Sequence, residues 1–287
     1  MKNQTRGILL VVLSAFCYGL TPTFTKQIYA FNISVISTIT LRFLIAFFAL
    51  GIFLLLKDKR LLYFERSKIR TYLILGTSYL SVLGFTLAAL KYSPIAIVIL
   101  ILYTYPILIF LYKIFFQNEA RDGKTVVLLF GSLLGMFLLM GTSFQNALSA
   151  GTMYAFLASI SFAVYVILSG KNSSNQSPFT LGFYTYFTAT IVISIYYIST
   201  IGFSVTLISA SILPFLLLGI GTTIFPSLLF LKALNYLKTT KAAALAMLEP
   251  LFAILFAFIL NGEKLTMIQI FGGTILFICS FIISSKK

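Results

Sequence analysis

Ten runs of mostly apolar residues follow one another along the chain, with short polar segments between them. A helix that crosses the hydrocarbon of a membrane needs about 20 such residues, because only internal hydrogen bonds can satisfy its backbone there. Only 9% of the 287 residues are charged, which is too few for a water-soluble surface. We therefore predict an all-α, polytopic membrane protein. The predicted spans are Gly7–Phe24, Val35–Leu56, Ile69–Leu90, Ile95–Phe116, Thr125–Thr142, Ser149–Ser169, Phe179–Ser199, Ser211–Leu231, Ala242–Leu260 and Thr266–Ser284.

The basic residues between the runs are unevenly distributed. Sixteen Lys and Arg residues fall on the side of the N-terminus, and three fall on the opposite side, at Lys26, Lys91 and Lys264. Because cationic loops resist translocation, this bias places both termini in the cytoplasm and the chain in the cytoplasmic membrane. The net charge of +15 therefore indicates topology, and we expect no nucleic-acid partner.

The chain contains a sparse internal repeat. A shift of 144 residues aligns its two halves and divides the chain into five-span units, residues 1–145 and 146–287. Because five is odd, the second unit must enter the membrane from the opposite side, which makes the repeat inverted. Such symmetry suits a transporter, since two copies of one unit can exchange inward-facing and outward-facing shapes. The aligned positions are Ala89–Tyr92 with Ala233–Tyr236, Tyr105 and Pro106 with Glu249 and Pro250, and Glu119 with Glu263.

A family resemblance follows from this duplicated pattern. Ala-Leu-x-Tyr before a span, a proline near its middle and a glutamate at its end occur over Ala89–Glu119 and again over Ala233–Glu263. Together with Arg42-Phe43 and the segment Leu248–Ala253, the pattern resembles the ten-helix EamA-type members of the drug/metabolite transporter superfamily. The resemblance covers essentially the whole chain. It implies an inner-membrane transporter with two inverted repeats around a central cavity, often an exporter of amino acids or other metabolites.

Two charged residues lie well inside the predicted spans, Glu249 and Arg42. An ionised side chain at the centre of a membrane helix costs about 2.5–3.5 kcal/mol, so each should face a cavity or a partner rather than lipid. On the functional hypothesis, Glu249 couples a proton or a cationic group of the substrate to movement, and Arg42 attracts a carboxylate or phosphate. On the structural alternative, the two residues pair with each other or with backbone and hold helices together.

Several uncharged residues are further candidates. Prolines inside spans interrupt the helix and free a backbone carbonyl, which can line a binding site or form a hinge. Tyrosines deep in spans carry a hydroxyl that prefers a partner, so they can line a cavity, although packing is the favoured role for each of them. The helix-break candidates are Pro106, Pro226 and Pro250, and the cavity candidates are Tyr18, Tyr79, Tyr103 and Tyr165.

Other functional classes fit the sequence less well. The chain has no histidine, and its only aspartates, Asp58 and Asp122, lie in loops, which argues against a membrane-embedded enzyme or a metal site. We expect no cofactor, and protons or a counter-solute as the driving force for an exporter or exchanger of an amino acid or related metabolite. A channel-like or lipid-handling protein is the alternative, and the sequence permits a monomer or a homodimer.

Overall fold

The computed structural model describes residues 2–117, 122–141, 150–201, 211–262 and 264–285, and it contains helices and no strands within them. Ten helical segments in these ranges are long and apolar enough to cross a membrane, which confirms the predicted class. Glu119 and Glu263, used above to recognise the repeat, lie outside the described residues. In chain order the spans are α1 (Lys2–Gly19) with α2 (Thr21–Tyr29), α3 (Val35–Lys57), α4 (Ile69–Leu90), α5 (Ile95–Leu102) with α6 (Tyr105–Gln117), α7 (Gly123–Met140), α8 (Ala150–Asn172), α9 (Pro178–Ile201), α10 (Ile212–Leu216) with a π-helix (Leu217–Ile224) and α11 (Phe225–Ala233), α12 (Thr239–Ala246) with α13 (Glu249–Asn261), and α14 (Met267–Ser285).

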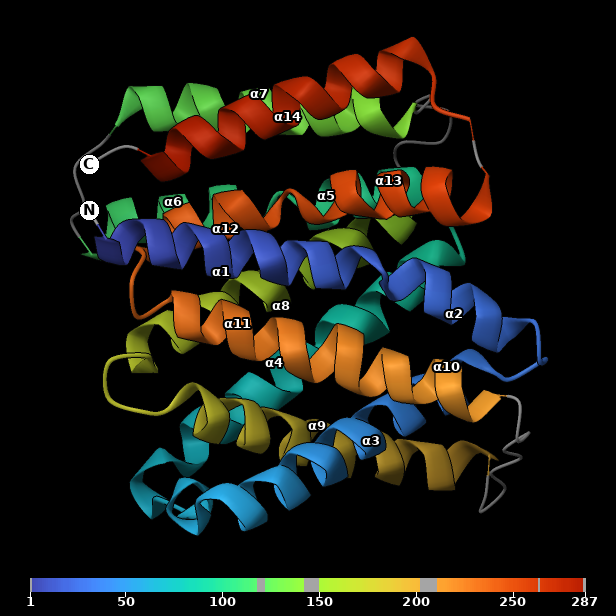
Figure 1. Ribbon diagram of the computed structural model, residues 1–287, viewed down its shortest axis with the longest axis vertical. Coiled ribbons are helices and arrows are strands. Elements are labelled where there is room, and N and C mark those ends of the chain that lie inside the picture. Colours follow the sequence, from blue (N-terminus) through green and yellow to red (C-terminus); the bar gives the residue numbers. More distant parts are fainter. Residues whose placement is uncertain (1, 118–121, 142–149, 202–210, 263, 286–287) are drawn as a thin grey trace.

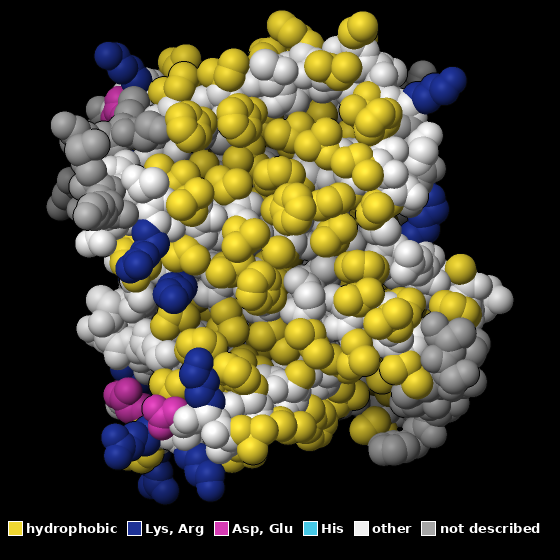
Figure 2. All heavy atoms as spheres, viewed as in Figure 1, with side chains coloured by type: hydrophobic (Ala, Val, Ile, Leu, Met, Phe, Trp, Pro, Cys, Tyr) yellow, Lys and Arg dark blue, Asp and Glu magenta, His cyan; other side chains and the backbone are white. Residues whose placement is uncertain are grey.

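The spans lie side by side, and α1 begins at the same end of the bundle at which α14 ends (Figure 1). We call this end the terminal face. Hydrophobic side chains form a continuous band across the middle of the bundle, and Lys and Arg gather mainly along the terminal face (Figure 2). This distribution is typical of a membrane-spanning protein, in which apolar side chains face the hydrocarbon and basic side chains lie at the interface with water.

Four spans change their helical course just before a proline. Pro22, Pro106, Pro226 and Pro250 are each the second residue of the helix that follows the change, in α2, α6, α11 and α13. Proline has no amide proton, and its ring clashes with the carbonyl four residues earlier, so the regular hydrogen bonding of the preceding turn is interrupted. The last three are the helix-break candidates of the sequence. Pro22 was not among them. The first span continues past Pro22 through α2 to Tyr29, so its predicted end at Phe24 was too early.

The closest packing joins spans from opposite halves of the chain. The described contacts pair α7 with α14, α4 with α8, α1 with α11 and α3 with α9. Between α7 and α14 the approach depends on two glycines, Gly135 and Gly272. A Cβ on Gly135 would lie 2.5 Å from the Leu276 nitrogen, and one on Gly272 would lie 2.5 Å from the Leu139 nitrogen. Small residues at such positions let membrane helices touch through their backbones.

We predict that Gly135→Ala lowers the free energy of unfolding by about 1–3 kcal/mol, because the added methyl group meets backbone that cannot move aside. Gly84→Ala is the matched control, since nothing lies within 4 Å of a Cβ at that helical position. Unfolding in mixed detergent micelles, followed by circular dichroism, measures both. Equal stability of the two variants would contradict the proposed role of Gly135.

Candidate functional site

A small cavity of about 20 Å³ lies between spans one, six, eight and nine. Its lining combines a carboxylate, hydroxyl groups and aromatic rings, and among the described residues that border it Glu249 alone is charged. Glu249 is partly buried, and its side chain reaches this cavity from the first turn of α13. The lining residues are Ser14, Ala15, Tyr18, Phe162, Tyr165, Ser227, Phe230, Ala246 and Glu249.

Glu249 lies where two interrupted spans meet. The break in the ninth span comes at Met247 and Leu248, so Glu249 opens α13. Its carboxylate is hydrogen-bonded to the Tyr103 hydroxyl, and Tyr103 caps α5 at the break in the fourth span. Because Pro250 has no amide proton, the Ala246 carbonyl loses its usual helical donor, and Ala246 borders the cavity. The two breaks therefore bring a carboxylate, a phenol and a freed backbone carbonyl close to one another.

Tyrosines from several spans form the rest of the site. The hydroxyl oxygens of Tyr18 and Tyr79 are 3.4 Å apart. The ring of Tyr79 lies 4.9 Å from that of Tyr165, and Tyr186 packs against Tyr79 at 6.4 Å between ring centroids. These rings come from spans one, three, six and seven, so both halves of the chain contribute hydroxyl groups to one aromatic cluster.

Arg42 has a different place. It is buried in α3, where its Nε donates to the Thr223 hydroxyl at 2.6 Å and its Nη2 donates to the Thr222 carbonyl at 3.2 Å. The Thr222 carbonyl is available because Pro226, four residues later, has no amide proton to give it. The Tyr186 hydroxyl donates to the neighbouring Thr223 carbonyl at 2.9 Å. Side chains from spans two and seven therefore bind the interrupted backbone of span eight.

Arg42 and Glu249 do not bond to each other. Among the residues that the structure describes, no hydrogen bond or ion pair joins them, although the Glu249 carboxylate lies within the electrostatic influence of Arg42. The hydrogen bonds of Arg42 to Thr222 and Thr223 fit the backbone-binding form of the structural alternative. Its attraction of an anionic substrate stays a prediction.

The structure thus brings most of the sequence candidates together. Tyr18, Tyr165 and Glu249 border the cavity, Tyr79 and Tyr103 contact residues that do, and Arg42 lies apart from its lining. Sequence reasoning missed Ser14, Phe162, Ser227 and Phe230, whose types are common in membrane helices. It also missed Tyr186, although the 144-residue shift places Tyr186 on Arg42. In the structure both side chains bind Thr223, Arg42 at its hydroxyl and Tyr186 at its carbonyl. In the described part of the chain, no three His, Cys, Asp or Glu side chains gather as a metal site would need.

Comparison with known proteins identifies the family. The model of the EamA-like transporter family matches residues 5–141 and, separately, residues 149–285. The chain belongs to the EamA-like transporter family. The two matched segments of this EamA-like protein begin 144 residues apart, which is the shift that aligned the sequence with itself.

Its relatives carry the same general description. An "uncharacterized transporter" of Archaeoglobus fulgidus is 27% identical over 284 residues, covering 94% of this chain and 93% of the relative. The uncharacterized transporter YcbK of Bacillus subtilis is 23% identical over 188 residues, covering 62% of this chain and 60% of the relative. One crystal structure superposes with a TM-score of 0.81 over 97% of both chains at 16% identity, which shows that the fold is shared.

We predict that Arg42→Gln and Thr223→Val, combined in a double-mutant cycle, show a coupling of about 1–2 kcal/mol in the free energy of unfolding, because a buried charged hydrogen bond is lost in each. Thr190→Val is the matched control. The Thr190 hydroxyl donates to the Phe43 carbonyl beside Arg42 but does not contact the guanidinium. Its coupling to Arg42→Gln should stay below about 0.5 kcal/mol. Additive effects of Arg42→Gln and Thr223→Val would show that their bond does not hold spans two and eight together.

Proposed function

We propose that this EamA-like protein is a secondary transporter that moves an amino acid or related small metabolite across the cytoplasmic membrane by alternating access, as an exporter or exchanger. The observation that carries the proposal is the position of Glu249. A carboxylate at the meeting point of two interrupted spans, beside a cavity of hydroxyls and aromatic rings, has the features of a solute site. Transporters commonly place such sites at broken helices near the middle of the membrane.

The arrangement of the halves supports alternating access. We propose that residues 1–145 and 146–287 are inverted repeats, since the family model matches each half once and successive spans alternate in direction (Figure 1). The pairing is also reciprocal. Packing of the third span on the sixth corresponds to packing of the eighth on the first, as a two-fold axis in the membrane plane would require. The basic residues along the terminal face favour a cytoplasmic location for both termini.

The size of the cavity indicates that the described conformation is closed. A volume of about 20 Å³ has room for roughly one water molecule. A metabolite can therefore enter only when the surrounding spans move apart. The breaks before Pro106 and Pro250 interrupt two of the spans that meet at Glu249, so we assign them the role of hinges.

The chemistry of the lining selects the type of solute. The Glu249 carboxylate can bind a protonated amine, the hydroxyls of Tyr18 and Ser14 can bind polar groups, and the rings of Phe162 and Tyr165 can cover an apolar part. Because one carboxylate binds either a proton or an ammonium group, the two compete for the same position. Such competition would couple solute movement to protons or to a second solute.

We predict that Glu249→Gln still exchanges unlabelled for labelled solute, but at a higher half-saturating concentration, because an amide binds an ammonium group more weakly than a carboxylate does. The variant should also lose its dependence on a pH gradient, because the amide cannot bind and release a proton. Proteoliposome counterflow with candidate amino acids, at several values of internal and external pH, measures both properties. Glu65→Gln is the matched control, since Glu65 lies in the loop before α4 and bonds to Ser67 and Gln176, away from the cavity. Full pH-driven transport by Glu249→Gln would reject coupling through this carboxylate.

A further inference from the structure

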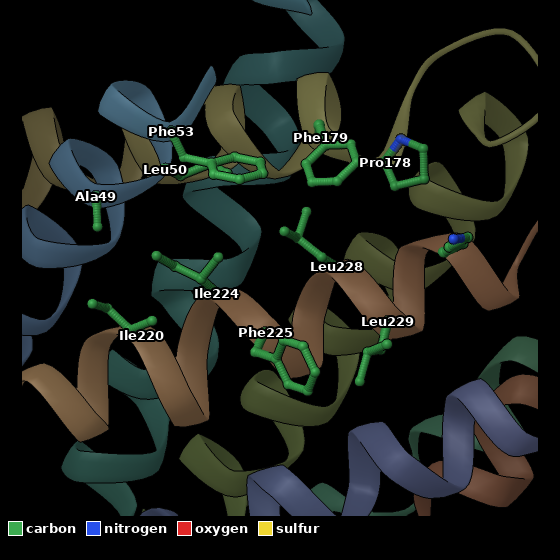
Figure 3. A pocket seen from close by; sticks show the side chains of 11 residues that line it. Ala49, Leu50, Phe53, Pro178, Phe179, Ile220, Ile224, Phe225, Leu228 and Leu229 are labelled. Atoms are coloured by element: carbon green, nitrogen blue, oxygen red, sulfur yellow. The ribbon is translucent and has the colours of Figure 1, made fainter. Parts of the chain in front are cut away.

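A second hollow lies on the side of the bundle, away from Glu249. Its volume is about 490 Å³, within the range of known ligand pockets. Leu50 and Phe53 of α3 and Phe179 of α9 form one wall, and Ile224 of the π-helix and Leu228 of α11 face them (Figure 3). We call this hollow the side groove. Its floor is fixed, because Leu50 and Ile224 are buried, whereas its rim is open, because 43% of the Phe53 surface is exposed.

Cations stand at one end of the side groove. Lys232, in the last turn of α11, belongs to its lining and is exposed. Lys57 ends α3, and its Nζ lies 5.1 Å from the ring centroid of Phe53 and 5.8 Å from that of Phe179, two rings that line the groove. Both lysines lie at span ends on the terminal face, where a membrane changes from hydrocarbon to headgroups.

The acidic residues nearby do not neutralise this end. The segment 57–70 contains six Lys and Arg residues against two acids, Asp58 and Glu65. Asp58 accepts a hydrogen bond from the Arg60 amide, and Glu65 accepts from the Ser67 hydroxyl. Glu65 also accepts a hydrogen bond from the Gln176 amide at 3.4 Å. Because six basic residues outnumber these two acids, the open end of the groove keeps a net positive charge.

We propose that the side groove is a binding site for one anionic phospholipid, with an acyl chain between α3 and α11 and the phosphate between Lys57 and Lys232. An apolar hollow that ends in two cations at the level of the headgroups matches an anionic amphiphile in both shape and charge. A protein partner fits less well, because the lining is apolar apart from Lys232 and belongs to helices that are candidate membrane spans. If the termini are cytoplasmic, as proposed above, this site lies in the cytoplasmic leaflet. The proposal that the groove binds the lipid does not depend on that orientation.

The bound lipid would touch the segment that Arg42 holds. Ile220 and Ile224 of the π-helix line the groove, and Thr222 and Thr223 between them receive the hydrogen bonds of Arg42 and Tyr186 from inside the bundle. An acyl chain on the outer side would therefore support the interrupted eighth span from the membrane.

Native mass spectrometry of the full chain, released from nanodiscs with equal parts phosphatidylglycerol and phosphatidylcholine, tests the proposal. We expect one phosphatidylglycerol to remain on the wild-type protein. Lys232→Gln should weaken its retention about fivefold, which is the contribution of one lysine near an anionic headgroup. Lys124→Gln removes an exposed lysine at the start of α7, on the same face but remote from the groove, and should leave retention unchanged. Ala49→Phe fills the groove without changing the charge and should abolish retention.

Four results would overturn the proposal. Equal retention of the two lipids would show that the cations select nothing, and equal losses in Lys232→Gln and Lys124→Gln would reduce the effect to overall charge. Retention that survives Ala49→Phe would place the lipid on the basic surface instead of in the groove. A lipid-free dimer that Ala49→Phe dissociates would assign the groove to a second copy of the chain. Because the experiment measures the mass of the protein with its bound lipid, its outcome does not depend on whether the protein transports a solute.

Discussion

In the hydrocarbon of a membrane, a backbone carbonyl without a donor has no water to bind, and each such group costs several kcal/mol. Pro226 creates this situation at Thr222, and Arg42 supplies the missing donor from another span. Ser14 donates in the same way to the Pro226 carbonyl at 2.7 Å, and the Tyr105 hydroxyl donates to the Ala243 carbonyl at 3.3 Å, close to the break in the ninth span. The polar side chains of this protein therefore gather where its helices are interrupted, and the candidate site is built from the same interruptions.

The same constraint explains why the site needs both halves of the chain. Two interrupted spans are bonded by residues from other spans: Tyr103 bonds to Glu249 in span nine, and Arg42 and Tyr186 bond to span eight. At the edge of the bundle, by contrast, α7 and α14 meet through Gly135 and Gly272 with their backbones in contact. Close glycine packing thus lies at the edge of the bundle, whereas side-chain hydrogen bonds to interrupted helices lie nearer its centre.

The spans, their breaks and the repeat could be predicted from the sequence, because a membrane span is recognisable from the length and low polarity of its apolar run. The ten spans and the three prolines that follow breaks within spans were predicted from local chemistry, and the 144-residue repeat reappears in the two family matches. Pairwise geometry was not predictable. Nothing in the sequence indicates that Tyr103 bonds to Glu249, that Arg42 turns to Thr222 and Thr223, or that an apolar groove ends at Lys232. Those contacts depend on how each helix is rotated about its axis relative to its neighbours. A span that is apolar on all sides does not show which of its faces points inward.

The central claim is that one closed site beside Glu249 opens to each side of the membrane in turn. Ala246→Cys, in a chain whose Cys17 and Cys279 are replaced by serine, places a thiol on the lining of the cavity. Labelling with a membrane-impermeant thiol reagent, applied to oriented vesicles from one side and then from the other, measures access directly. The account predicts labelling from both sides, with a transported solute on either side slowing the reaction. Labelling from one side alone, or free passage of the reagent through the protein, would contradict it.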